Sequence, residues 1–254
     1  MTPKILLFDI ETSPLLAYVW GMYEQNVIKV VRPWYFLCFA YKWLGEGSTK
    51  VIALPDFKLY SKAKYDDYEV VKKLRELLDQ ADIVIAHNGD KFDIKKFNTR
   101  CLEQGIDLPS PFRTIDTLKV ARSRFSFTSN KLDSLGEALD VGRKVKTGGF
   151  ELWDGCINGD ERSWRLMKKY NKQDVDLLEK VYLKLRPTML NHPNVSVYND
   201  DINLACPNCG LSDYQKRGYR QTNSYWYNRY QCTCGAWFNG KQSLGIRKPL
   251  IDKV

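Results

Sequence analysis

The sequence predicts an α/β fold, in which helices flank a mixed sheet, followed by a small separate β module. Segments with strand and helix patterns alternate up to about residue 118, as expected for a layered α/β domain. The pattern beyond that point is mainly helical. At Leu204 the composition changes to Cys, Tyr, Arg and Gly, which indicates a second unit of different construction.

The strands are predicted from short runs of apolar, aromatic or β-branched residues. These runs cover residues 4–10, 34–43, 50–54, 82–86 and 113–117. The first run is almost continuously apolar, which is typical of a strand buried on both faces at the centre of a sheet.

Helices are predicted where apolar residues recur at spacings of three and four. They cover residues 66–80, 92–104, 131–139 and 160–185, and Gly105 ends the second. Residues 186–201 contain Pro187, Pro193 and three Asn without periodicity, so a linker is expected there. The predicted organisation is a domain over residues 1–186, a linker over 187–203, and a C-terminal module with a basic tail over 204–254.

Composition narrows the class of protein. With 44% hydrophobic and 27% charged residues, the chain reads as a globular protein, and no apolar run reaches the ~20 residues that a membrane span needs. The N-terminal residues lack a signal-peptide cleavage pattern, so a cytoplasmic location is expected. The net charge is +9, and residues 204–254 hold eight Lys and Arg against two acids. This excess points to a polyanionic partner such as nucleic acid, although a merely solvated basic tail would have the same composition.

The first acidic motif is Asp9-Ile10-Glu11, at the end of the first apolar run. Residues i and i+2 of a strand point to the same face, so the carboxylates of Asp9 and Glu11 are directed together. Adjacent carboxylates repel unless a cation lies between them, and oxygen ligands suit Mg²⁺ or Mn²⁺. Two solvated acids at a strand end remain the alternative.

The second motif, residues 87–93 (HNGDKFD), follows a predicted strand and opens a helix. Asp93 would lie in the first helical turn, where backbone N–H groups favour anionic partners. The alternative is that Asp90 or Asp93 only caps the helix. We assign His87 a structural role or a place at the edge of the substrate site.

The third motif is Tyr170 and Asp174, one helical turn apart on a single face. An ordinary amphipathic helix with a half-buried Tyr would give the same pattern. Asp176 lies nearby but points to a different face.

Together the three motifs resemble those of the DEDD superfamily of exonucleases, which have an RNase-H-like fold. The Tyr four residues before the last Asp resembles the DEDDy branch, which includes the proofreading domains of family B DNA polymerases. The similarity covers roughly residues 4–185, and segment 131–136 (KLDSLG) is similar to the helix that such enzymes carry between the second and third motifs.

The resemblance implies a role for each residue of the motifs. Asp9 would bridge two metal ions, and Glu11 and Asp174 would complete the site of the ion that activates water. Asp93 would serve the second ion, and the hydroxyl of Tyr170 would orient the attacking water. Two divalent ions of this kind clamp the attacking and leaving oxygens of a displacement at phosphorus. Asn88 and Phe92 would shape the approach of the terminal nucleotide.

The C-terminal module contains four cysteines in two close pairs, Cys206/Cys209 and Cys232/Cys234. Four thiolates in such pairs suit one tetrahedral Zn²⁺, and the module resembles a zinc ribbon. The second pair is Cys-x-Cys, one residue shorter than the usual spacing, and Gly235 can help its turn. Two unliganded, reduced pairs are the alternative. Cys38, Cys101 and Cys156 stand alone and are expected to be buried.

Basic and aromatic residues alternate between the two cysteine pairs, which suits contacts with phosphates and bases. The expected contacts are Lys216, Arg217, Arg220, Trp226 and Arg229. Part of the aromatic set is expected to form the core of the module instead.

The resemblance implies a metal-dependent 3′→5′ exonuclease with two Mg²⁺ or Mn²⁺ and one structural Zn²⁺. DNA, single-stranded or at a frayed 3′ end, is the expected substrate, and replication or repair proteins are possible partners. Two alternatives stay open: an RNase or structure-selective endonuclease with the same chemistry, and a non-catalytic nucleic-acid-binding protein on the same fold. Retention of all five active-site residues argues against the second alternative.

Overall fold

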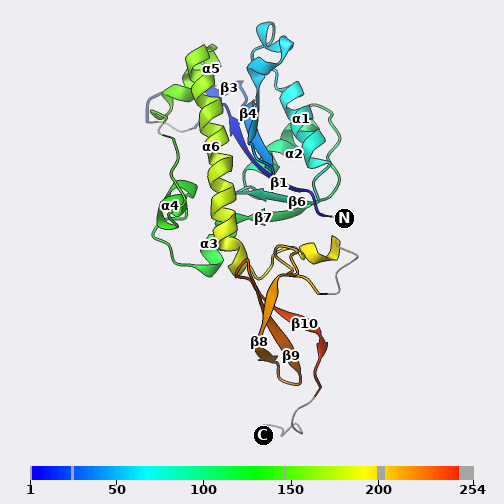
Figure 1. Cartoon of the computed structure of the whole chain (residues 1–254). Coiled ribbons are helices and arrows are strands. Elements are labelled where there is room, and N and C mark those ends of the chain that lie inside the picture. Colours follow the sequence, from blue (N-terminus) through cyan, green and yellow to red (C-terminus); the bar gives the residue numbers. More distant parts are fainter. Residues whose placement is uncertain (1, 24–25, 146, 199–203, 246–254) are drawn as a thin grey trace. The chain divides into compact units, whose positions relative to one another are not determined.

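The computed structural model describes residues 2–23, 26–145, 147–198 and 204–245 of the chain (Figure 1). It divides into two compact units. One unit comprises Lys4–Tyr182, and the other comprises Leu183–Val254 together with Met1–Pro3. No helix within the described ranges is both long and apolar enough to cross a membrane.

A five-stranded mixed sheet in the order β5-β4-β1-β6-β7 forms the centre of the larger unit. Strand β1 is antiparallel to β4 and parallel to β6, and β6 is parallel to β7. The strands are β1 (Ile5–Thr12), β4 (Phe36–Trp43), β5 (Lys50–Ala53), β6 (Ile83–Ala86) and β7 (Arg113–Asp116). The fold class predicted from the sequence is therefore confirmed, and the apolar run at the N-terminus is the central strand.

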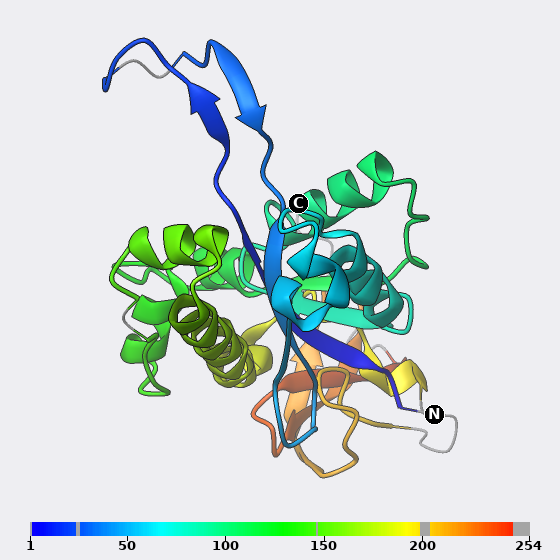
Figure 2. The same ribbon diagram turned by 90° about the horizontal axis from the view of Figure 1, so that it is seen from above.

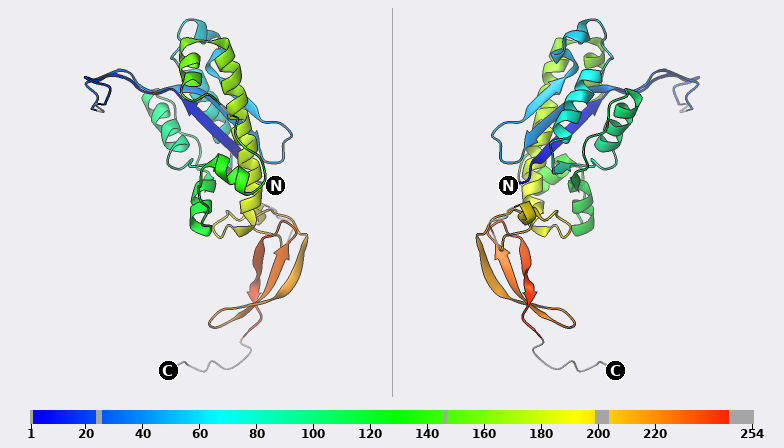
Figure 3. Two further views of the ribbon diagram at one scale, coloured as in Figure 1. Left: turned by 90° about the vertical axis from the view of Figure 1, so that its left-hand side faces the viewer. Right: turned by 90° about the vertical axis from the view of Figure 1, so that its right-hand side faces the viewer.

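Helices cover both faces of this sheet (Figure 3). They are α1 (Tyr68–Leu78), α2 (Asp93–Glu103), α3 (Thr117–Arg124), α4 (Leu132–Ala138), α5 (Glu151–Asn158) and α6 (Glu161–Leu185), with short 3₁₀ turns η1 (Leu54–Asp56) and η2 (Lys58–Ser61). Leu6 and Phe8 of β1 belong to one buried cluster with Val70 of α1 and Phe97 of α2. Burial of these apolar side chains holds α1 and α2 against one face of the sheet. The opposite face of β1 is directed toward α6.

A two-stranded arm, which the sequence patterns did not predict, interrupts the connection between β1 and β4. It consists of β2 (Leu16–Tyr18) and β3 (Lys29–Arg32), paired antiparallel, and it projects from the sheet (Figure 2). The base of the arm is closed by Ser13, whose N–H donates to the carbonyl of Tyr35 at 2.9 Å and whose Oγ accepts from the N–H of Tyr35 at 3.0 Å. Several large apolar side chains of the arm are exposed, including Trp20 at 82% and Met22 at 93%.

The smaller unit contains a three-stranded antiparallel sheet in the order β10-β9-β8. Its strands are β8 (Tyr214–Gln221), β9 (Trp226–Cys232) and β10 (Trp237–Ser243), and two 3₁₀ turns precede them, η3 (Arg186–Thr188) and η4 (Val195–Tyr198). The predicted linker thus contains short turns, and its residues 199–203 lie outside the described residues. The aromatic rings of Tyr214, Tyr230 and Phe238 pack together in this unit, with centroids 5.2–5.5 Å apart.

Candidate active site and cysteine cluster

The first acidic motif lies on the central strand of the large sheet. Strand β1 extends to Thr12, two residues beyond the predicted end, so Glu11 belongs to the strand. Asp9 and Glu11 are half-buried on one face, while Ile10 between them is buried in the cluster beneath the other face. The period of the strand therefore directs the two carboxylates together, as expected from the sequence.

The third motif meets the first in space. A carboxylate oxygen from each of Asp9, Glu11 and Asp174 can be chosen so that all three lie within 4.8 Å of one another. Asp174 projects from α6 and is buried, with 1% of its surface exposed. A strand and a helix far apart in sequence thus build one acidic cluster. The pair Asp9 and Asn171, on the same elements, is separated by 162 residues.

Asp93 stands beside this cluster rather than within the three-carboxylate group. It is the first residue of α2 and is buried, and its Oδ1 accepts a hydrogen bond of 3.1 Å from the N–H of Ile10. The negative charge of Asp93 raises the pKa of Asp9, after the larger effect of burial. The four acids of the motifs are therefore electrostatically coupled, with Asp93 tied to the backbone of the strand that carries Asp9 and Glu11.

Each member of the three-carboxylate group has a polar neighbour that holds it. The amide of Asn171, a fully buried residue of α6, donates to Asp9 Oδ2 at 2.8 Å. Lys144 Nζ donates to Asp174 Oδ2 at 2.5 Å. Burial raises the pKa of Glu11, and hydrogen bonding from the indole of Trp153 on α5 opposes that rise. These contacts restrict the rotamers of the acids before any ligand binds.

Burial and mutual repulsion make the cluster reluctant to ionise completely. Burial, followed by repulsion from Asp174, raises the pKa of Glu11 to about 8. Burial raises the pKa of Asp93 to about 7 and also raises the pKa of Asp174. Loss of hydration alone would lower the pKa of Lys144, but the neighbouring Asp174 and Tyr170 raise it above its usual range. One ammonium thus partly neutralises the cluster.

The donor set fits divalent metal ions. Hard cations such as Mg²⁺ prefer carboxylate oxygens, and four acids offer enough of them for two ions. Asp174 Oδ1 is buried and has no hydrogen-bond partner among the described residues, so one oxygen of the cluster still lacks a positive neighbour. A buried, unpaired anionic oxygen is costly, and a cation bound to it removes that cost.

Tyr170 lies one turn before Asp174 on α6, as the sequence predicted for a single helix face. Its hydroxyl accepts a hydrogen bond of 3.3 Å from Lys144 Nζ. Burial raises the pKa of Asp174, and hydrogen bonding from Lys144 and Tyr170 opposes that rise. The ring packs edge-on against Trp153, with centroids 6.0 Å apart. Burial, and then the negative charge of Asp174, raises the pKa of the phenol, so the hydroxyl stays protonated at neutral pH.

His87 is engaged on both sides of its ring. Nδ1 lies 2.9 Å from Thr117 Oγ1, and Nε2 lies 3.0 Å from the carbonyl oxygen of Asn130. Burial lowers the pKa of the imidazole, which keeps it neutral. Because a carbonyl only accepts, Nε2 carries the proton and Nδ1 accepts from Thr117. A ring held in this way connects α3 with the segment before α4 and has no free nitrogen to act as a general base.

The remaining residues of the second motif lie between β6 and α2. Asn88 adopts a positive φ of 68°, and its N–H donates to Asp116 Oδ1 at 2.9 Å. Phe92 is exposed and precedes α2. Asp90 forms an ion pair with Lys119 at 2.6 Å, and the structure shows no side-chain cap at the start of α2. Capping of this helix therefore does not explain the acids of the motif.

Three residues of the site were not predicted from the sequence: Asn171, Lys144 and Trp153. Asn171 follows Tyr170 directly, and its position on the inner face of α6 could have been read from helical periodicity. Lys144 and Trp153 lie between the predicted helices, in a stretch where glycines obscure the pattern. No sequence signal connects these two residues with the acids.

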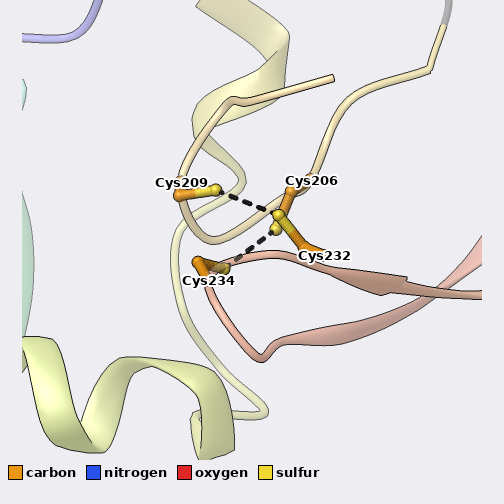
Figure 4. A group of neighbouring side chains, drawn as sticks. All are labelled: Cys206, Cys209, Cys232 and Cys234. Atoms are coloured by element: carbon orange, nitrogen blue, oxygen red, sulfur yellow. Dashed lines mark hydrogen bonds between the residues drawn. The ribbon is translucent and has the colours of Figure 1, made fainter. Parts of the chain in front are cut away.

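The cysteines of the smaller unit form one cluster (Figure 4). The four sulfur atoms lie within 4.8 Å of one another, and Sγ atoms of opposite pairs approach to 3.7 Å (Cys206 and Cys234) and 3.5 Å (Cys209 and Cys232). Tetrahedral Zn²⁺ with Zn–S bonds of ~2.3 Å places sulfurs about 3.8 Å apart. Hydrogen bonding from Cys209 lowers the pKa of Cys206 to about 5, so one thiolate forms readily. The cluster fits a zinc ribbon.

Glycines shape both turns of this cluster. Gly210 (φ 75°) follows the first pair and Gly235 (φ 89°) the second, and in each turn the glycine N–H donates to a cysteine carbonyl at 2.8 Å. These left-handed conformations are accessible to glycine at little cost. The short Cys-x-Cys pair therefore brings Cys234 into the same cluster as Cys209 of the longer Cys-x-x-Cys pair.

Basic residues expected to contact nucleic acid lie on the outer surface of this sheet. Lys216, Arg217, Arg220 and Arg229 are exposed, and Trp226 is half-buried. The guanidinium of Arg229 lies over the ring of Trp237 at 4.5 Å. In contrast, Tyr214, Tyr230 and Phe238 pack against the cysteines, so the aromatic residues of the module are divided between its core and its surface.

Comparison with known proteins identifies the family. Residues 43–186 match the model of the RNase_H superfamily. This range is more than half of the chain, and the chain therefore belongs to the RNase_H superfamily. The matched range begins after β1, so the strand that carries Asp9 and Glu11 lies outside it. Membership supports a nuclease-type function, and nucleases of this fold use divalent metal ions.

Two DNA polymerases are similar to the chain. A PolC-type DNA polymerase III of Ureaplasma parvum serovar 3 is 26% identical over 257 residues, which cover 97% of this chain and 17% of the polymerase. The family B DNA polymerase from the archaeon Pyrobaculum calidifontis has a similar structure, with a TM-score of 0.54 and 17% identity, over 73% of this chain and 25% of that chain. The matched part of the chain thus spans between a sixth and a quarter of the length of these polymerases. The second likeness supports the fold alone.

Proposed function

We propose that this protein is a metal-dependent 3′→5′ exonuclease that hydrolyses DNA, at single-stranded or frayed 3′ ends, with two divalent metal ions. The observation that carries the proposal is the convergence of Asp9, Glu11 and Asp174 within 4.8 Å, with Asp93 beside them. A group of wholly or partly buried acids with raised pKa values is costly to a fold, and cation-dependent chemistry accounts for it.

Asp9, Glu11, Asp93 and Asp174 would hold the two ions. Bound there, divalent cations supply an activated water nucleophile and stabilise the charge that develops on the leaving oxygen. Tyr170, protonated at neutral pH, is placed to orient the attacking water with its hydroxyl. Asn171 fixes the rotamer of Asp9, so this ligand does not have to be ordered when substrate arrives.

A pocket beside the cluster supports a terminal nucleotide as the substrate unit. It has a volume of about 400 Å³, and its lining includes Thr12 next to Glu11, the aromatic side chains of Trp34, Phe150 and Trp153, and Lys96. Aromatic faces stack on nucleobases without strong sequence preference. Phe92, exposed at the start of α2, lies within 5.3 Å of Lys96 Nζ and adds a further ring.

The similarity to a PolC-type DNA polymerase III favours DNA over RNA as the substrate. The zinc ribbon would add affinity for nucleic acid through the exposed cations Lys216, Arg217, Arg220 and Arg229. For an exonuclease that acts on DNA, the proposed protein partners are replication or repair proteins. A domain division near residues 186 and 204 and a cytoplasmic location complete the proposal.

A time course on DNA and RNA oligonucleotides, labelled at either end and incubated with Mg²⁺ or Mn²⁺, tests the proposal. Release of the 3′ label as mononucleotide from DNA is expected, with a ladder of products that retain the 5′ label. Internal cuts would indicate an endonuclease, and preferential RNA cleavage would indicate an RNase. Binding without cleavage by the zinc-loaded protein would indicate the non-catalytic alternative.

A further inference from the structure

A second and more polar groove, of about 630 Å³, opens beside the acidic cluster. It is formed by the loop after β6, by α3, and by the segment that leads into α4. Arg122, Lys131 and Lys144 line it, together with the hydroxyl side chains of Thr128 and Ser129. Unlike the aromatic pocket near Thr12, this groove offers mainly cationic and hydrogen-bonding groups.

Two of the three cationic side chains in the groove form no salt bridge with another described residue. These are Arg122 and Lys131, and both are exposed. The charge of Arg122 is close enough to lower the pKa of His87, although burial lowers that pKa more. The acid in the lining, Asp133, accepts a hydrogen bond of 2.6 Å from the N–H of Lys144. The groove therefore has a net positive character and fits a polyanion.

The groove begins at the reacting centre. Lys144 lines it, and Lys144 Nζ is 2.5 Å from Asp174 Oδ2. In the sheet, β1 with its two acids lies between β4 and β6. The aromatic pocket includes Trp34, just before β4, whereas the cationic groove includes His87, just after β6. The two pockets thus flank the acids from the two sides of the central strand.

The aromatic pocket and the cationic groove match the two parts of a strand that is cut near its 3′ end, which are the terminal nucleotide and the remaining strand. An aromatic pocket suits one base, and a row of cations suits a continuing sugar–phosphate chain. We propose that the cationic groove binds the backbone of the nucleic-acid strand on the 5′ side of the scissile bond, with Arg122 and Lys131 each neutralising one phosphate. The proposal rests on the nuclease function above and adds the path of the retained strand.

The test compares the full-length protein with the variant Arg122→Ala/Lys131→Ala on two substrates. One is a short single-stranded DNA oligonucleotide, and the other is the p-nitrophenyl ester of thymidine 5′-monophosphate, which has no upstream phosphate. For the oligonucleotide, KM should rise about tenfold, and the slope of log KM against log salt should fall by roughly 1.4, about 0.7 for each lost contact. Hydrolysis of the ester should be unchanged, because Arg122 and Lys131 do not touch the acids.

A matched control removes the same charge elsewhere in the same unit. Lys58→Ala/Lys72→Ala also loses two exposed cations that form no salt bridge with other described residues, and it should retain the wild-type KM and salt slope. The conservative variant Arg122→Lys/Lys131→Arg should behave like wild type. If Arg122→Ala/Lys131→Ala were indistinguishable from the control variant on the oligonucleotide, the proposal would be overturned.

A binding measurement separates this proposal from the proposed activity. Fluorescence anisotropy of a labelled DNA oligonucleotide without added Mg²⁺ or Mn²⁺ reports affinity without turnover. If the wild type hydrolysed neither substrate, the proposed function would fail, and the affinity difference between the two double variants would still decide whether the groove binds the strand. Equal affinities would count against the groove, and weaker binding by Arg122→Ala/Lys131→Ala alone would support it.

Discussion

The side-chain amide of Asn171 donates a hydrogen bond of 2.8 Å to Oδ2 of Asp9, and this bond joins α6 to the central strand at the acidic cluster. Asn171 is fully buried, and its own amide oxygen accepts a hydrogen bond from the thiol of Cys38 at 3.6 Å. The thiol thus contacts the amide oxygen of Asn171, and the amide N–H of Asn171 orients Asp9.

Replacing Asn171 by Ala should therefore weaken metal binding. Loss of a partner behind a metal ligand costs about 10–100-fold in metal affinity or activity. The measurement is the Mg²⁺ concentration for half-maximal activity. Cys38→Ala is the matched control, since it removes the neighbour of Asn171 and leaves the bond to Asp9 in place. An equal Mg²⁺ requirement in both variants would contradict a positioning role for Asn171.

Substitution of the acids themselves should abolish cleavage. Asp9→Ala and Asp174→Ala each remove a carboxylate from the cluster and little apolar volume, so circular dichroism should show a folded protein without activity. Asp176→Ala is the control, because Asp176 lies on the same helix but accepts a hydrogen bond from Thr49 outside the cluster. Wild-type turnover by a folded Asp9→Ala protein would exclude the proposed mechanism.

Tyr170→Phe tests the phenol. The ring would still pack against Trp153, so only the hydroxyl is lost, and kcat should fall by at most ~10²–10⁴-fold. Asp174→Ala should be more damaging. His87→Ala should change kcat less than Tyr170→Phe, because both ring nitrogens of His87 are occupied by Thr117 and Asn130. The opposite order of the two effects would make His87 the more important group.

Without metal, the protein should lose stability as the pH rises from about 5 to 8. In the folded protein the pKa of Glu11 is about 8 and that of Asp93 about 7, above the values near 4 of unfolded carboxyls. The folded state then holds more protons across this window, so the free energy of unfolding decreases with rising pH. Melting temperatures measured without added Mg²⁺ or Mn²⁺ should show this decrease.

Mg²⁺ should reverse the effect, since it binds the ionised acids. At pH 8 a concentration of 100 Kd adds about 2.7 kcal/mol of stability. At pH 5 protons compete for the same oxygens, and the Mg²⁺-induced shift in melting temperature should be small. A shift of equal size at both pH values would mean that Mg²⁺ binds elsewhere.

The cysteine cluster should hold one Zn²⁺ per chain, measurable by elemental analysis of protein purified without a chelator. Cys234→Ser removes a thiolate from the short pair and should release the ion and unfold the module, because zinc binding contributes folding free energy at such sites. Thr233→Ala, which changes the residue between Cys232 and Cys234, should retain zinc. Zinc retained in full by Cys234→Ser would show that this cysteine is not a ligand.

The elements that could be predicted from the sequence are those with a strong period. The strand with Asp9 was predicted from a continuous run of apolar residues. The helix with Asp174 was predicted from apolar residues at spacings of three and four. The contact between them had to be inferred from a family resemblance, because no period relates a residue near the N-terminus to one on α6.

The elements that were missed have physical reasons. The arm formed by β2 and β3 exposes its apolar residues, so its sequence has no buried face to create an alternating pattern. Helix α5 follows Gly148 and Gly149, which have positive φ, and it spans only eight residues. Trp153 lies on this helix, so its place near the acids was not predicted either.

The two hydrogen bonds between Ser13 and Tyr35 form a clasp that separates the arm from the sheet, so the length of the arm can vary. It closes the arm at its base, where the chain leaves β1 and enters β4, and both strands lie in the core of the sheet. Insertions or deletions beyond this clasp would lengthen or shorten the arm without shifting the register of β1 against β4, so Asp9 and Glu11 would stay in place. Related chains can therefore differ widely in length between Ser13 and Tyr35 while keeping the same arrangement of Asp9 and Glu11.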